Sequence, residues 1–240
     1  MRRLGRLAAV CAAVAAAGAG GLTGCKQMQQ LEGPSPSPGA PVQGAPPPPG
    51  AVPPGAAQAL ASLAVAPAGS LDGYSRDAFG QAWSDDVTVP GGHNGCDTRN
   101  DILHRDLTGV QTRPGTHDCV VTAGTLQDPY TAKAIQFTKA RAGLVQIDHI
   151  VPLAYAWRMG ARDWPPDKRR NLANDPANLL AVDGPSNESK GDEGPAQWLP
   201  PNVAYRCAYA AKFVTVAATY ALPVTAADKQ TLTQTLQPCH

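Results

Sequence analysis

The sequence has little net charge. Its 240 residues carry 20 lysines and arginines against 19 aspartates and glutamates, a formal net charge of +1 at pH 7. Three of the basic residues, Arg2, Arg3 and Arg6, lie in the first six positions, and without them 17 basic residues face 19 acidic ones. A chain with this balance offers no overall attraction to a polyanion. Binding of nucleic acid would therefore need a local basic patch.

A hydrophobic run long enough to span a membrane is also missing near the N-terminus. The stretch from Leu7 to Gly21 is almost entirely Ala, Val, Leu and Gly, and it is shorter than the roughly 20 residues that a span requires. Following arginines, such a run is typical of a secretory signal. It ends in "LTGC", which resembles a bacterial lipobox and implies cleavage before Cys25 and lipidation of its thiol. We expect residues 1–24 to be a lipoprotein signal peptide and Cys25 to anchor the exported chain to the cell membrane. Secretion by an ordinary signal peptide is the alternative.

Residues 32–58 lack aromatic side chains and carry one charge, but they are rich in proline and glycine. Such a segment cannot bury enough apolar surface to fold. We therefore expect residues 25–59 to form a disordered tether. Residues 60–240 are long enough for one domain with its own core.

Closely spaced cysteines are absent as well. The folded part holds Cys96, Cys119, Cys207 and Cys239, with no C-x2-C pair among them. This spacing disfavours a four-cysteine zinc site, which remains the alternative. An even number of cysteines in an exported domain favours two disulfides. We predict Cys96–Cys119 and Cys207–Cys239, because each pair closes a local loop within its own half of the domain.

Helical and strand patterns alternate along the folded part. Helix starts are predicted after three capping positions: Ser75, Asp97 or Thr98, and Thr225. Short strands are predicted near residues 119–126, before Pro152, and at Leu179–Val182. The expected fold class is α+β, a small antiparallel hairpin or sheet embedded in helices.

An Asp–His pair interrupts one of these apolar strands. In "VQIDHIVPL", Asp148 and His149 stand where a buried charge is costly unless something compensates it. Asn178 opens the next predicted strand, and Asn187 and Lys190 follow on one face of a predicted helix. Two strands followed by a helix could bring that face against Asp148 and His149.

These residue types suit phosphodiester cleavage, which needs a base and a divalent cation. We interpret His149 as the base, and Asp148 and Asn187 as oxygen ligands of Mg²⁺, with Mn²⁺ or another divalent ion as alternatives. Asn178 would orient the imidazole. Lys190 would contact a phosphate as a point charge.

The string "DHIVP … N-L-L … N-x-x-K" resembles the HNH, or ββα-metal, nuclease motif, with Asn187 in place of the last histidine. The wider segment of about residues 70–240, including "GYSRDAFG", "NGCDTRND" and "WLPPN", resembles exported actinobacterial HNH proteins. Those are related to the C-terminal domain of GmrSD-type restriction endonucleases. The resemblance implies a ββα-metal core at about residues 143–195. It also implies the roles already given to Asp148, His149, Asn178 and Asn187.

Two further segments contain arginine residues outside this motif. "DKRRN", with Lys168, Arg169 and Arg170, is a candidate phosphate-binding patch. A solvated loop is the alternative. For "GCDTRND" we favour a helix cap with Arg99 in a structural ion pair.

The sequence therefore predicts an exported, membrane-anchored HNH endonuclease that cleaves DNA, with RNA as an alternative substrate. We expect a monomer with nucleic acid and the membrane as its partners, and no protein partner. Two alternatives stay open. One is a catalytically idle surface lipoprotein that binds nucleic acid or a cell-wall polymer, and the other is a hydrolase of another phosphodiester polymer, such as a teichoic acid.

Overall fold

The computed structural model describes residues 55–239. The predicted signal peptide, the lipidation site Cys25 and nearly all of the predicted tether lie outside these residues. The first helix, α1 (Ala56–Ser62), begins inside the range predicted as tether. Within residues 55–239, none of the helices combines the length and the apolar character needed to cross a membrane.

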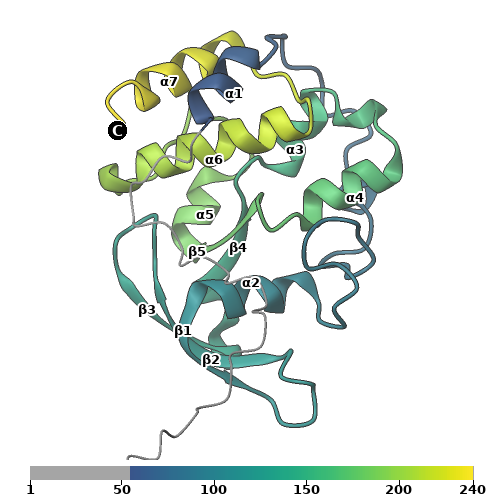
Figure 1. Cartoon of the computed structure of the whole chain (residues 1–240), viewed down its shortest axis with the longest axis vertical. Helices are drawn as coiled ribbons and strands as arrows, with labels where there is room; N and C mark the ends of the chain where they lie inside the picture. The colour runs from purple at the N-terminus through teal and green to yellow at the C-terminus, as the bar shows by residue number, and fades with distance from the viewer. Residues whose placement is uncertain (1–54, 240) are drawn as a thin grey trace, which may run out of the picture. The chain divides into compact units, whose positions relative to one another are not determined.

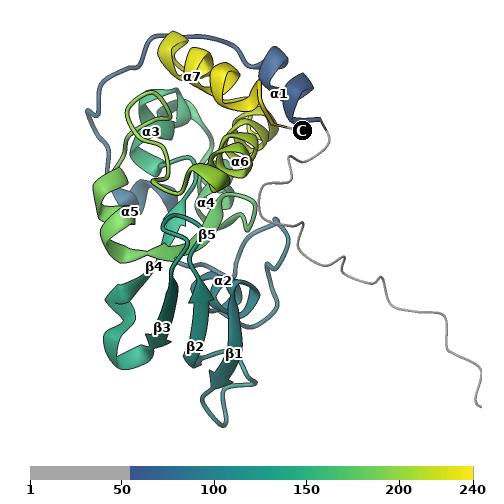
Figure 2. The ribbon, with the colours of Figure 1, turned by 90° about the vertical axis from the view of Figure 1, so that its left-hand side faces the viewer.

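A three-stranded antiparallel sheet, β1–β2–β3, forms one end of the described part (Figure 2). Its strands are β1 (Leu107–Thr112), β2 (Val121–Gln127) and β3 (Ala134–Thr138). Helix α2 (Thr98–Asp106) precedes it, and the Asp97 side chain accepts a hydrogen bond from the Asn100 amide, as the capping pattern predicts. Strand β1 was not predicted, because it follows α2 without a turn.

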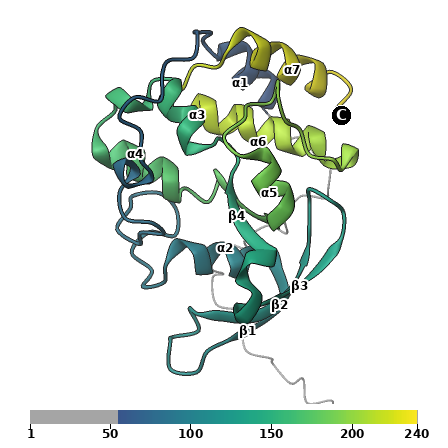
Figure 3. The same cartoon turned by 180° about the vertical axis from the view of Figure 1, so that it is seen from behind.

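A second, two-stranded antiparallel sheet pairs β4 (Val145–His149) with β5 (Leu179–Asp183). In its register Asp148 faces Leu180, and His149 faces Leu179. Helix α5 (Gly184–Lys190) starts directly after β5 and packs against both strands, next to β4 in Figure 3. The predicted strand–strand–helix unit is therefore formed.

The long connection between β4 and β5 is mostly helical. Further helices lie at the end of the domain away from the three-stranded sheet (Figure 2). The connection contains α3 (Leu153–Arg158), the short 3₁₀ helix η3 (Ala161–Asp163) and α4 (Pro166–Asn174). Helices α6 (Arg206–Thr219) and α7 (Ala226–Leu236) pack with α1. The remaining 3₁₀ helices are η1 (Arg76–Phe79), η2 (Lys139–Leu144) and η4 (Val203–Tyr205).

The β4–β5 pair lies between the helices and the three-stranded sheet (Figure 1). Two hydrophobic clusters meet at this pair. One, the helical core, contains Leu180 and Val182 together with side chains of α3 and α6. The other, the sheet core, contains Val145, Ile147 and Leu179 together with side chains of α2 and the three-stranded sheet. Since successive residues of a strand point to opposite faces, both faces of this pair are buried. Strand β5 is accordingly apolar from Leu179 to Val182, whereas β4 carries Asp148 and His149 at buried positions. The α+β class is confirmed.

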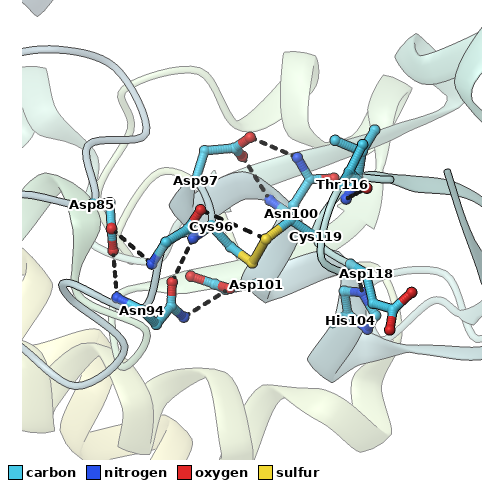
Figure 4. Close-up of a disulfide and its surroundings, with 12 residues drawn as sticks. Asp85, Asn94, Cys96, Asp97, Asn100, Asp101, His104, Thr116, Asp118 and Cys119 are labelled. Carbon is cyan, nitrogen blue, oxygen red and sulfur yellow. Dashed lines mark hydrogen bonds between the residues drawn. A yellow bond between two sulfur atoms is a disulfide. The ribbon is translucent and has the colours of Figure 1, made fainter. Parts of the chain in front are cut away.

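Both predicted disulfides are formed, Cys96–Cys119 with Cα atoms 5.2 Å apart and Cys207–Cys239 with 5.8 Å. Figure 4 shows the first of them beside the cap of α2, where Asp97 accepts hydrogen bonds from Asn100. The bond therefore ties the start of α2 to the segment that leads into β2.

Candidate active site

A cleft of about 590 Å³ runs along β4. Four consecutive residues of the strand, 146–149, line it, although they alternate between the two faces of the sheet. This is possible because the cleft follows the edge of β4 that does not pair with β5. Asn187 from α5, Arg99 from α2 and Arg76 from η1 contribute further walls. Asp148, His149 and Asn187 are therefore brought together, as the sequence predicted.

Asp148 is buried beside an internal cation. Its side chain is 5% exposed and pairs with the fully buried Lys190, whose Nζ donates to Oδ1 and Oδ2 at 2.8 Å each. Tyr130 donates its hydroxyl to Oδ2 at 2.5 Å, and Lys190 also donates to the His149 carbonyl at 2.6 Å. Burial lowers the pKa of Lys190, and the contact with Asp148 acts in the opposite direction. The carboxylate that looked costly in the sequence is thus compensated within the protein.

His149 lies in a different environment. Its Nε2 is 2.9 Å from the Ala173 carbonyl oxygen, at the C-terminal end of α4. The indole of Trp83 stacks on the imidazole, with ring centroids 6.0 Å apart and planes 13° apart. Burial lowers the pKa of His149 to about 3, with Arg76 and Lys190 adding to the effect and the Ala173 hydrogen bond opposing it.

This geometry fixes the tautomer of His149. A carbonyl oxygen can only accept a hydrogen bond, so Nε2 carries the hydrogen. Because the ring is neutral above about pH 3, Nδ1 keeps its lone pair. His149 therefore carries a proton-acceptor nitrogen, and its side chain lines the same cleft as Asp148 and Asn187.

Asn178 supports His149 through the backbone. Its fully buried side chain accepts from the Val151 amide at 2.8 Å and donates to the carbonyls of Val151 (3.3 Å) and Leu172 (3.1 Å). Val151 lies two residues after His149, and Leu172 directly precedes Ala173. Asn178 thus joins the segment that carries the imidazole to the segment that carries its carbonyl partner.

The donor set fits a hydrated hard cation. Asn187 donates Nδ2 to Gln146 Oε1 at 2.8 Å, which leaves its Oδ1 as the ligating atom of the amide. The three hydrogen bonds to Asp148 use three of the about four lone-pair positions of a carboxylate. Two protein oxygens with water and phosphate suit Mg²⁺, which is seldom caged by protein alone. Residues 55–239 contain no cluster of three His, Cys, Asp or Glu side chains arranged to hold a metal.

Two predictions need correction. Lys190 cannot serve as an exposed phosphate contact, because its ammonium is enclosed behind Asp148. The "DKRRN" cations lie on α4 and are engaged within the protein. Lys168 donates to Tyr220 O and lies over Trp164, Arg169 donates to Ala78 O and Trp164 O, and Arg170 pairs with Asp86 and Asp167.

Sequence reasoning also missed residues that line the cleft or contact Asp148 and His149. Trp83 was not considered, and its backbone φ of 58° is unusual for a bulky residue. Tyr130, Ala173 and Arg76 carried no local signal, because each acts through a contact between segments far apart in the chain. Arg99 was interpreted as structural, but it lines the cleft.

Comparison with known proteins shows the family of the chain. The family described as GmrSD restriction endonucleases, C-terminal domain, matches residues 97–235, which include every element of the strand–strand–helix unit. The chain belongs to this family. The match begins at the cap of α2 and ends within α7, so both hydrophobic clusters of this GmrSD C-terminal domain lie largely inside it.

A fungal relative shows that the domain also occurs in a protein described as secreted. An uncharacterized secreted protein of Arthroderma benhamiae is 41% identical over 182 residues, which cover 75% of this chain and 82% of the relative. No solved structure matches the chain.

Proposed function

We propose that the protein is a metal-dependent endonuclease of the HNH type that hydrolyses phosphodiester bonds of DNA, with RNA as the alternative substrate. The observation that carries the proposal is the His149 tautomer. The hydrogen bond from Nε2 to the Ala173 carbonyl leaves Nδ1 as a base in the same cleft as Asp148 and Asn187. The nuclease family supports the same reaction class.

In this proposal the Asp148 carboxylate and the Asn187 amide oxygen hold Mg²⁺, which would neutralise charge that develops on the phosphate. Lys190 pairs with the Asp148 carboxylate inside the protein and would hold it in position as a ligand. Asn178 holds the His149 and Ala173 segments in register.

His149 would take a proton from the water that attacks phosphorus, as one P–O bond of the backbone breaks. A base whose pKa is about 3 is weak in the empty cleft. An anionic phosphate in the cleft favours the imidazolium ion and raises this pKa. His149 would therefore be a better base with substrate bound.

We further propose that the enzyme acts outside the cytoplasm, held to the membrane through a lipid on Cys25. The lipobox-like "LTGC" and the secreted relative support export. Such a location suits degradation of extracellular DNA.

The decisive experiment incubates the purified, disulfide-bonded protein with supercoiled plasmid and with RNA, in Mg²⁺, Mn²⁺ or EDTA. We expect cleavage with a divalent ion, no cleavage in EDTA, and a loss of at least about 100-fold in the His149→Ala variant. His104→Ala is the matched control, because His104 lies on the exposed face of α2 and bonds only the Asp118 carbonyl.

The outcomes separate the alternatives. If the wild type cleaves neither nucleic acid with any ion but binds it, the protein is an idle nucleic-acid-binding lipoprotein. Cleavage that persists in EDTA would remove the metal from the proposal. Release of phosphate esters from teichoic acid, without cleavage of nucleic acid, would assign the site to another polymer.

A further inference from the structure

Two arginines in the cleft carry charge that the protein leaves uncompensated. Arg99 on α2 and Arg76 on η1 both line the cleft with Asp148, His149 and Asn187. Within residues 55–239, neither guanidinium lies within 4.0 Å of a carboxylate oxygen, whereas Arg105, Arg158 and Arg170 all form ion pairs.

Arg99 is the more informative of the two. It is half-buried, and its Nη2 donates to the Val145 carbonyl at 3.3 Å. Val145 is the first residue of β4, so this bond fixes the guanidinium beside the strand that carries Asp148 and His149. Burial lowers the pKa of Arg99, and the charge of Asp97 opposes this. A partly desolvated guanidinium that forms no ion pair favours the binding of an anion. Its planar set of N–H donors matches the oxygens of a phosphate.

Arg76 is exposed, and together with His149 it lines both this cleft and a smaller cavity bounded by Ala173. Among the described residues, Arg76 forms no ion pair with an acid of the cleft: Asp148 pairs with Lys190, Asp192 pairs with Arg158, and Glu188 accepts a hydrogen bond from Gln146.

We propose that Arg99 and Arg76 bind backbone phosphates of the nucleic acid in the cleft, and that this pair positions the substrate for His149. The inference rests on the proposed function, from which the phosphodiester substrate comes. Phosphate binding, which the sequence predicted for the cations of α4, is thereby assigned to α2 and η1. The α4 cations already bond within the protein.

The test measures binding without cleavage. Fluorescence anisotropy of a short fluorescein-labelled DNA, with EDTA present, gives the affinity at several NaCl concentrations. We expect Arg99→Gln and Arg76→Gln each to weaken binding about tenfold at low salt. Each should lower the slope of log affinity against log salt by about one, as the loss of one phosphate contact does. Arg99→Lys should keep most of the slope and lose part of the affinity, because lysine lacks the fork.

Arg113→Gln and Lys168→Gln are the matched controls. Arg113 is an exposed arginine after β1, and Lys168 lies on α4. Neither should change the slope. Thermal unfolding of Arg99→Gln and Arg99→Lys separates a folding defect from lost binding, since a merely structural role would lower both melting temperatures and leave the salt slope intact.

An unchanged slope in both glutamine variants would overturn the inference, and so would a loss of equal size in Lys168→Gln. Plasmid cleavage by the wild type with an unchanged slope in the variants would leave the proposed function standing and remove only the arginine pair. Binding that depends on the two arginines, without cleavage in the presence of any metal, would support the arginine pair and contradict the proposed function.

Discussion

The two sides of β4 solve the problem of a buried polar residue in opposite ways. On one side, Asp148 keeps its charge and is matched by a buried ammonium and a tyrosine hydroxyl. On the other side, His149 gives up its charge and is enclosed by an indole and a backbone carbonyl. Adjacent residues thus present an anion and a neutral base to one cleft. The comparison shows two ways to offset the cost of burying an ionisable side chain: pairing its charge with an opposite charge, or keeping the side chain neutral. Adjacent residues of one strand use the two ways.

The largest expected effect comes from removing the cation on the Asp148 side. Lys190→Met should lower the free energy of unfolding by about 3–5 kcal/mol, because it leaves a buried carboxylate without its partner. Urea unfolding measures this loss. Lys133→Met, an exposed lysine before β3, should stay within about 0.5 kcal/mol of the wild type.

A double variant sharpens this prediction. Asp148→Asn combined with Lys190→Met removes both charges, and it should recover part of the stability that Lys190→Met loses. Equal losses in the single and the double variant would mean that packing around the lysine stem, rather than its charge, stabilises the fold.

The second prediction concerns pH and the His149 side. The unfolded chain takes up a proton on this histidine near pH 6.5, whereas the folded protein does so only near pH 3. Between these values the unfolded state binds more protons, so the stability contributed above pH 6.5 is lost as pH falls toward 3. The loss is about 1.4 kcal/mol per pH unit, or about 2 kcal/mol between pH 6.5 and 5.

Urea unfolding of the wild type and of His149→Gln across this pH range isolates the contribution of the imidazole. Glutamine can still donate to the Ala173 carbonyl but does not titrate. The stability difference between the two proteins should shrink as the pH falls, and a constant difference would contradict the neutral, buried histidine.

The third prediction returns to the Asp148 side with a smaller change. Tyr130→Phe removes one hydrogen bond to the carboxylate while Lys190 remains, so we expect a loss of about 1.5 kcal/mol. Tyr209 offers a matched control on α6, because its buried hydroxyl has no hydrogen-bond partner among the described residues. Tyr209→Phe should be neutral or slightly stabilising, and equal losses in the two variants would assign the effect to packing.

The parts of this site that sequence could predict are those carried by order and spacing along the chain. The strand–strand–helix unit, the placement of Asp148, His149 and Asn187, and both disulfides followed from local patterns. The role of Lys190 did not, because a lysine on a helix face looks the same whether it faces solvent or a buried carboxylate. The α4 cations were misread for the same reason, since only the folded chain shows that Tyr220, Ala78 and Asp86 engage them.

The smallest expected effect concerns the stack of Trp83 on His149. Trp83→Leu keeps an apolar side chain and the same strained backbone, with φ of 58°, but loses the aromatic ring. A double-mutant cycle with His149→Gln, measured by urea unfolding, should therefore give a coupling energy of about 1 kcal/mol. Trp83→Phe retains a ring and should retain part of that coupling. Zero coupling with leucine would mean that Trp83 only fills space, and that the Ala173 carbonyl alone orients the imidazole.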